Sequence, residues 1–254
     1  LSYVPLTKDE TFYAMMIEEQ IEHPTLVPTL FGYPTYWKPF LFFWVYSLFA
    51  IFLKVLPLSI EAVYRLPTHF FGLVNIVLVY SILRNINIPR VMAFLTTIVY
   101  SFTFLTVFIA NSVLIDTLLS TFLFSSFLVY LNRSMDDRKY LIAGLLTFFT
   151  YFVKTYLALI IPILAIVYFY LNDRKVLQNK FFLLSLAAVP LALLLNSHIQ
   201  ATTVNDQTLY ELYKYDLINR VDPTDFLSKI TGTYTFYEYT NVWLVLSIFG
   251  FLKF

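Results

Sequence analysis

The chain has 254 residues, of which 59% are hydrophobic and only 13% are charged. A soluble domain carries charge on about a quarter of its residues, so this chain has too few charges to coat a water-facing surface, and lipid must cover much of it. The net charge of +1 argues against nucleic acid as a partner, and the absence of cysteine excludes disulfides and thiolate metal sites.

The two ends of the sequence suggest an internal piece of a longer protein. The chain starts at Leu1, and its first 38 residues hold charges and prolines but no apolar span, so we expect neither a signal peptide nor an anchor in this part. The apolar run Trp243–Phe254 stops abruptly. We therefore expect a preceding span and a C-terminal part to be missing.

Long apolar stretches predict an all-α polytopic membrane protein. A spanning helix needs about 17–25 apolar residues, and several stretches approach that length. The expected helices occupy 63–196, followed by an outer loop at 197–238 and a truncated helix at 239–254. The individual candidates are Val63–Leu83, Val91–Ala110, Thr117–Leu131, Tyr140–Val153, Thr155–Leu171, Phe181–Asn196 and Tyr239–Phe254.

Basic residues in three short loops predict the orientation. Arg84–Arg90, Asn132–Lys139 and Asn172–Lys180 together hold eight lysines and arginines. Short loops rich in lysine and arginine stay in the cytoplasm, so we place these three loops there. Counting spans from them then puts Asp116 and the loop 197–238 on the outer side.

The apolar stretch Pro39–Leu56 can be read in two ways. If it crosses the membrane, the residues before it are cytoplasmic. If it lies in the interface, residues 1–62 form one outer loop, with 39–56 as its interfacial segment. Trp44 and Tyr46 suit an interfacial belt, so we favour the second interpretation.

Three acids are candidates for chemistry on the outer side. Asp9 and Glu10 are adjacent, and acids at such a position also suit the first turn of a helix. Asp116 lies between two long apolar runs. An ionisable residue at membrane depth is a functional candidate, although a helix cap explains Asp116 equally well.

Three cations share that side. Lys38 and Arg65 stand at the edges of apolar stretches, and Lys154 stands between two apolar runs. Lysine and arginine at such edges commonly extend to the interface. Together with the acids, however, they suit attack on a group linked to a lipid phosphate: cations for the phosphate, and Asp9, Glu10 or Asp116 as general base or as ligands of a divalent cation.

The order of these motifs resembles the polyprenyl-phosphate-dependent glycosyltransferases of the GT-C fold. The likeness is to glycosyltransferase family 39, with its protein O-mannosyltransferases and aminoarabinose transferases, and it covers roughly residues 9–171. The stretches that carry it are Asp9–Ala14, Val27–Trp44 with its Lys38-Pro39 pair, Arg65–Gly72, Leu114–Leu119 and Phe152–Thr155.

The resemblance implies a GT-C transmembrane helix bundle whose first outer loop carries juxtamembrane helices. It further implies transfer of a sugar, with inversion, from a polyprenyl (dolichyl or undecaprenyl) phosphate to a hydroxyl of a protein, lipid or glycan. Asp9 would be the base, Asp116 the second outer acid, and Lys38 the phosphate ligand, with Arg65 and Lys154 as further phosphate contacts.

Two departures from the family pattern qualify this hypothesis. Trp37 stands where some relatives have a metal-binding glutamate, which weakens the case for a metal, and Thr155 replaces a glycine after Lys154. Two rivals remain open. One is a non-enzymatic transporter or lipid-binding membrane protein that uses the same charges along a substrate path, and the other is an inactive GT-C paralogue.

Overall fold

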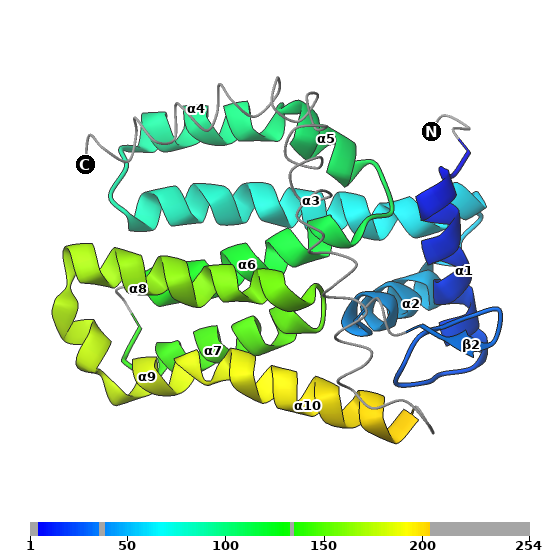
Figure 1. Ribbon diagram of the computed structural model, residues 1–254. Helices are drawn as coiled ribbons and strands as arrows, with labels where there is room; N and C mark the ends of the chain where they lie inside the picture. The colour runs from blue at the N-terminus through cyan, green and yellow to red at the C-terminus, as the bar shows by residue number, and fades with distance from the viewer. Residues whose placement is uncertain (1–4, 36–38, 133–134, 204–254) are drawn as a thin grey trace, which may run out of the picture. The chain divides into compact units, whose positions relative to one another are not determined.

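A computed structural model describes residues 5–35, 39–132 and 135–203, which are mostly helical (Figure 1). Lys38 and Trp37 lie outside the described residues. So do most of the expected outer loop 197–238, from residue 204 onward, and the expected truncated helix 239–254. The account below concerns the compact unit that ends at Ile199.

The first elements are helix α1 (Lys8–Glu22), a hairpin of β1 (Thr29–Leu30) and β2 (Tyr33–Pro34), and helix α2 (Leu41–Leu53). Both turn residues of the hairpin have positive φ, 56° at Phe31 and 77° at Gly32. The Glu19 carboxylate of α1 accepts hydrogen bonds from the backbone N–H groups of both. The hairpin is thereby fastened to α1.

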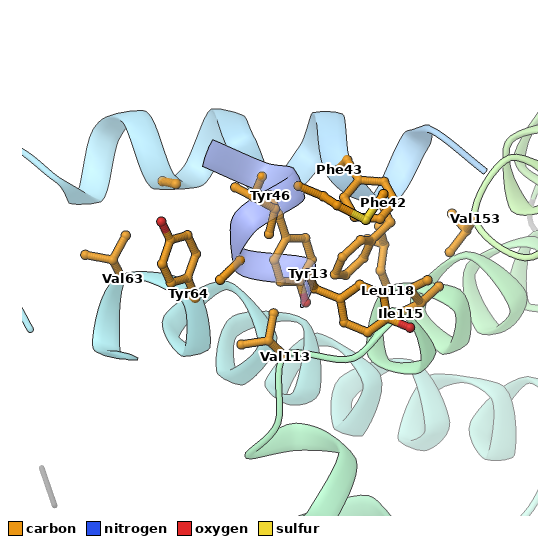
Figure 2. Close-up of a cluster of buried hydrophobic side chains, with 14 of the residues drawn as sticks. Tyr13, Phe42, Phe43, Tyr46, Val63, Tyr64, Val113, Ile115, Leu118 and Val153 are labelled. Atoms are coloured by element: carbon orange, nitrogen blue, oxygen red, sulfur yellow. The ribbon is translucent and has the colours of Figure 1, made fainter. Parts of the chain in front are cut away.

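Helix α2 is the segment for which the sequence left two interpretations. Its 13 residues span roughly 20 Å, whereas the hydrocarbon core of a bilayer is about 30 Å thick. It buries Phe42, Phe43 and Tyr46 in a cluster with Tyr13 of α1 (Figure 2). The short length and the packing on α1 favour the interfacial interpretation.

The remaining helices follow the expected apolar runs, and one of these runs is sharply bent. Helices α4 and α5 divide the run expected at Val91–Ala110 and are bent by 62°. The break occurs because Thr103 leaves the helix and its hydroxyl accepts a hydrogen bond from Thr106 N–H, a local bond that competes with helix continuation. The elements are α3 (Ile60–Asn85), α4 (Arg90–Ser101), α5 (Phe104–Ala110), α6 (Ile115–Leu131), α7 (Lys139–Tyr151), η1 (Thr155–Leu159), α8 (Ile160–Asn172), η2 (Arg174–Gln178), α9 (Lys180–Leu186) and α10 (Ala188–Thr203).

Within the described ranges, two helical segments are long and apolar enough to cross a membrane. They are Ile60–Asn85 and Lys180–Ile199, and the bent pair α4–α5 makes a third if it is counted as one span. Helices α2, α6 and the segment Leu157–Asn172 are apolar but shorter. The expected helical fold is thus confirmed, while the full set of spans in a GT-C bundle stays a prediction.

Large apolar side chains on the outer helix faces are exposed. Leu73 and Val77 of α3 are 66% and 63% exposed, and Leu194 of α10 is 66% exposed. Monomeric soluble proteins rarely expose large contiguous apolar patches. These faces therefore suit contact with lipid.

The three basic turns lie at one end of the helices, and α1 and α2 lie at the other (Figure 1). The turns join α3 to α4, α6 to α7 and α8 to α9. A hydrogen bond of 2.7 Å from the Asn179 amide to the Asp137 carboxylate connects two of them. This separation of the two ends agrees with the orientation predicted from the loops.

Helices α7 and α9 approach closely at Gly144, which suggests a test of the packing. A Cβ atom at this position would lie 2.9 Å from Ser185 Cα and 3.0 Å from Ser185 Cβ, so the Gly144→Ala variant must push α9 away. We expect a loss of about 1–3 kcal/mol in the free energy of unfolding, measured by denaturation in detergent. The neighbouring Leu145→Ala serves as control because Leu145 is 55% exposed; equal stability of Gly144→Ala and the parent chain would contradict this packing.

Candidate functional site

The carboxylate of Glu10 is buried and accepts four hydrogen bonds. Its Oε1 accepts from Arg65 Nε at 2.9 Å and from the Val113 N–H at 2.9 Å. Its Oε2 accepts from Arg65 Nη2 at 2.8 Å and from the Thr7 N–H at 2.8 Å. The side chain is 1% exposed, so every lone pair that water would otherwise satisfy has a protein donor.

These bonds bring together three separate parts of the chain. Glu10 belongs to the first turn of α1, Arg65 to α3, and Val113 to the link between α5 and α6. Arg65 Nη2 also donates to Pro5 O at 3.1 Å. Glu10 thereby positions its neighbour Asp9 and also Asp116, which follows Val113 by three residues.

The protonation of Glu10 is fixed by its partners. Burial by itself raises the pKa of this carboxyl, but the hydrogen bonds from Arg65, Thr7 and Val113, with the charge of Arg65, outweigh burial and hold the pKa at about 2. A carboxylate that accepts several such bonds stays ionised. Glu10 is therefore a permanent anion at neutral pH.

Asp116 forms an ion pair with Lys154. The distance from Lys154 Nζ to Asp116 Oδ1 is 2.7 Å, and both side chains are about one third exposed. Asp116 lies in the first turn of α6, and Lys154 in the turn between α7 and η1. Both residues were candidate site residues from the sequence, and the structure brings them together as an ion pair.

The turn that carries Lys154 is also attached to the start of α2. The Leu41 N–H donates to Phe152 O at 3.1 Å, and the rings of Phe40 and Phe152 lie with their centroids 4.9 Å apart. Leu41 follows Lys38 by three residues, and Phe152 precedes Lys154 by two. Lys38 itself lies outside the described residues.

Asp9 and Asp116 both act on the phenol of Tyr13. Burial raises the pKa of Tyr13 to about 12, and the charges of Asp116 and Asp9 add to the effect. Tyr13 follows Asp9 by one helical turn and packs among the aromatic rings of α2 (Figure 2). Both carboxylates therefore favour the protonated form of the Tyr13 phenol.

Asp9 differs from the other acids in its surroundings. Its side chain is exposed, and within the part of the chain that the structure describes it makes no hydrogen bond or ion pair. Its carboxylate is therefore accessible to a solute, whereas that of Glu10 is not.

Four of the predicted site residues form two ion pairs, and the sequence missed one pairing. Sequence analysis expected Glu10 to be catalytic and Arg65 to contact phosphate, but they bind each other, which favours positioning roles for both. The pattern Thr7-x-x-Glu10 is a capping-box signature and could have identified the role of Glu10. Tyr13 was also missed, because nothing in the sequence marks one tyrosine among 20.

The described acids do not fit a divalent cation. No group of three or more His, Asp or Glu side chains in the described ranges is placed to hold a metal ion. Both oxygens of Glu10 already accept hydrogen bonds from N–H groups. The metal considered from sequence, with Asp9, Glu10 and Asp116 as ligands, has no support in this geometry.

The Glu10–Arg65 pair predicts a large loss of stability on substitution. Removing one partner leaves a buried charge without compensation, so Glu10→Gln should lower the free energy of unfolding by about 3 kcal/mol. The matched control is Glu18→Gln on the same helix, which breaks a half-exposed ion pair with Lys54 and should cost less than about 1 kcal/mol. Thermal unfolding in detergent measures the stability of both variants. Equal losses of stability would contradict the buried position of the Glu10–Arg65 pair.

The pKa of Glu10 predicts a pH window for this stabilisation. Because the pKa falls on folding from 4.5 to about 2, the contribution is complete above pH 4.5 and is lost as the pH falls toward 2. The stability difference between the parent chain and Glu10→Gln should therefore be constant from pH 7 to 5 and shrink below pH 4.5. Melting curves of both proteins across this range measure it, and a difference independent of pH would disprove the assignment.

No family model, curated protein or solved structure matches this chain.

Proposed function

We propose that the chain belongs to an integral membrane glycosyltransferase of the GT-C type, with its active site on the non-cytoplasmic face. Its donor is a sugar on a polyprenyl phosphate, and its acceptor is a hydroxyl of a protein, lipid or glycan. The observation that carries the proposal is the hydrogen bond from the Val113 N–H to Glu10, which joins the helix of the accessible acid Asp9 to the segment that leads to the Asp116–Lys154 pair. The motif order of the sequence supports the same reading.

In the proposed reaction, Asp9 takes the proton of the acceptor hydroxyl. The hydroxyl oxygen attacks the anomeric carbon of the sugar, and the bond from that carbon to the phosphate oxygen breaks, so the configuration inverts. The polyprenyl phosphate leaves with the bonding electron pair. Fixed cations stabilise charge that develops on a leaving group, and Lys38 and Lys154 supply them here.

Lys154 suits this role because its present partner is exchangeable. The Asp116–Lys154 pair is about one third exposed, and such pairs contribute little net stability, about 0–1 kcal/mol. A donor phosphate can therefore replace Asp116 as the partner of Lys154. Asp116 then becomes available to orient the acceptor.

Arg65 takes a different role from the one expected from sequence. Its guanidinium is bound to the Glu10 carboxylate and to Pro5 O. We assign it to positioning Asp9 through Glu10. The phosphate contacts then fall to Lys38 and Lys154.

The bent pair α4–α5 favours one alternative, a transporter of lipid-linked substrates. Interrupted helices are common where transporters bind substrate, and this pair is bent by 62° within one apolar run. A transporter would move a labelled lipid-linked sugar across a vesicle membrane without cleaving it. The assay below separates the two functions because it detects cleavage.

The activity test compares Asp9→Asn with Glu22→Gln. Purified protein is incubated with radiolabelled polyprenyl-phosphate sugars and candidate acceptors, and release of each sugar from the lipid is measured. Loss of a general base typically lowers the rate by about 10²–10⁴-fold, so Asp9→Asn should lose that much turnover while donor binding is kept. Glu22 is an exposed acid on the same helix, and its substitution should change nothing.

Two results would count against the proposal. Full turnover by Asp9→Asn would remove Asp9 as the base. Intact lipid-linked sugar after incubation with every donor, together with movement across the membrane, would establish the transporter.

A further inference from the structure

The basic turns at the end of the helices opposite α1 carry more positive charge than the described acids neutralise. Arg84–Arg90, Asn132–Lys139 and Asn172–Lys180 hold eight basic residues against three acids. Arg90, Arg138, Lys175 and Lys180 are exposed. The ion pairs among the described residues lie elsewhere, at Lys54–Glu18, Arg65–Glu10 and Lys154–Asp116.

The three acids of these turns are occupied by uncharged donors. Asp136 accepts from the Arg138 backbone N–H at 3.0 Å, and Asp173 accepts from the Lys175 backbone N–H at 3.2 Å. Asp137 accepts from the side-chain amide of Asn179 at 2.7 Å. Each acid thus shapes a turn, and the exposed side chains of Arg138, Lys175 and Lys180 remain available for an external anion.

The Asp137–Asn179 bond makes two of the turns into one surface. Asn179 also caps α9, because its side-chain oxygen accepts from the Phe181 N–H at 2.9 Å. The first turns of α7 and α9 are therefore held beside each other, with Arg138 before α7 and Lys180 at the start of α9 (Figure 1). Lys175 belongs to η2, which directly precedes α9 in the chain.

Apolar surface begins immediately beside the cations. Leu141 and Ile142 of α7 are 42% and 45% exposed, and Leu183 and Leu184 of α9 are 52% and 59% exposed. A phospholipid has a matching arrangement, because its charged phosphate lies next to its apolar acyl chains. Free inorganic phosphate would make no use of the apolar part.

We propose that Arg138, Lys175 and Lys180 form a docking surface for the headgroups of anionic phospholipids, at the end of the helices away from Asp9. The surface anchors that end at the negatively charged leaflet and fixes the depth of the helices. This proposal depends on the location of the chain in a membrane but not on glycosyl transfer. The lipid-docking surface and the glycosyltransferase function can therefore be disproved independently. Arg174 is left out because its guanidinium lies 4.4 Å from the Tyr170 ring and also donates to Tyr170 O. Lys180 Nζ lies 5.1 Å from the Phe181 ring, but among the described residues it has no hydrogen-bond acceptor.

The test measures binding of short-chain lipids to the whole chain in neutral detergent. The probes are dioctanoyl phosphatidylglycerol, dioctanoyl phosphatidylcholine and inorganic phosphate. Each lysine or arginine near an anionic surface contributes roughly a fivefold gain in affinity, so the parent chain should prefer phosphatidylglycerol by at least about tenfold. The preference should fall when salt is raised, because salt screens exposed charges.

The variant Arg138→Gln/Lys175→Gln/Lys180→Gln should lose the preference for phosphatidylglycerol. The matched control, Lys214→Gln/Arg220→Gln/Lys229→Gln, removes the same charge from the predicted outer loop and should keep the preference. The single variants Lys175→Gln and Lys180→Gln should give intermediate values, which tests the surface even if the triple variant is unstable.

Three results would overturn the proposal. The first is equal affinity of the parent chain for both lipids. The second is competition by inorganic phosphate at the same concentration as phosphatidylglycerol, which would indicate a small-anion site. The third is an equal loss of preference in the control variant, which would make the effect one of total charge.

Discussion

The buried ion pair between Glu10 and Arg65 joins α1 to α3, which also meet in the hydrophobic cluster that contains Tyr13, Tyr64 and Val113. A charge taken out of water costs several kcal/mol, and only good geometry with full hydrogen bonding offsets that cost. Glu10 meets the condition with two bonds from Arg65 and two from backbone N–H groups. The rest of the proposed site follows from this contact, because Asp9 is adjacent to Glu10 and the Val113 N–H bonded to it stands three residues before Asp116.

The two ends of the helices use charge in opposite ways. Near α1, the charged side chains face one another, as in Glu10–Arg65 and Asp116–Lys154. At the basic turns, the acids bind neutral N–H groups, and Arg138, Lys175 and Lys180 are exposed. The first arrangement orders a site within the protein, and the second favours an anion outside it. The positive-inside bias of the sequence reflects only the second.

Much of the helical framework could be predicted because apolar runs are a strong signal. The run Val63–Leu83 became α3 and the run Thr117–Leu131 became α6, with ends shifted by at most three residues. The break in Val91–Ala110 was missed, because it depends on a single hydroxyl bond at Thr103 that hydropathy does not record. The Lys154–Asp116 contact was predictable from the cost of an unpaired acid near the membrane. The Glu10–Arg65 contact was not predictable, because each residue alone had a sufficient local explanation. For Glu10 it was the dipole of a helix first turn, and for Arg65 it was extension to the membrane interface.

The choice of base among the three acids is a question of what each carboxylate already binds. Glu10 is surrounded by donors that hold its pKa at about 2, and a carboxylate stabilised in this way accepts protons poorly. Asp116 is engaged by Lys154 and becomes free only if another anion takes that lysine. Tyr13 stays protonated because burial and two nearby carboxylates raise its pKa to about 12. In the proposed reaction, Asp9 is the exposed acid that can meet an acceptor hydroxyl without first giving up a partner among the described residues. The assignment therefore follows from the pairings, and it would pass to Asp116 only in a state where a bound phosphate has drawn Lys154 away.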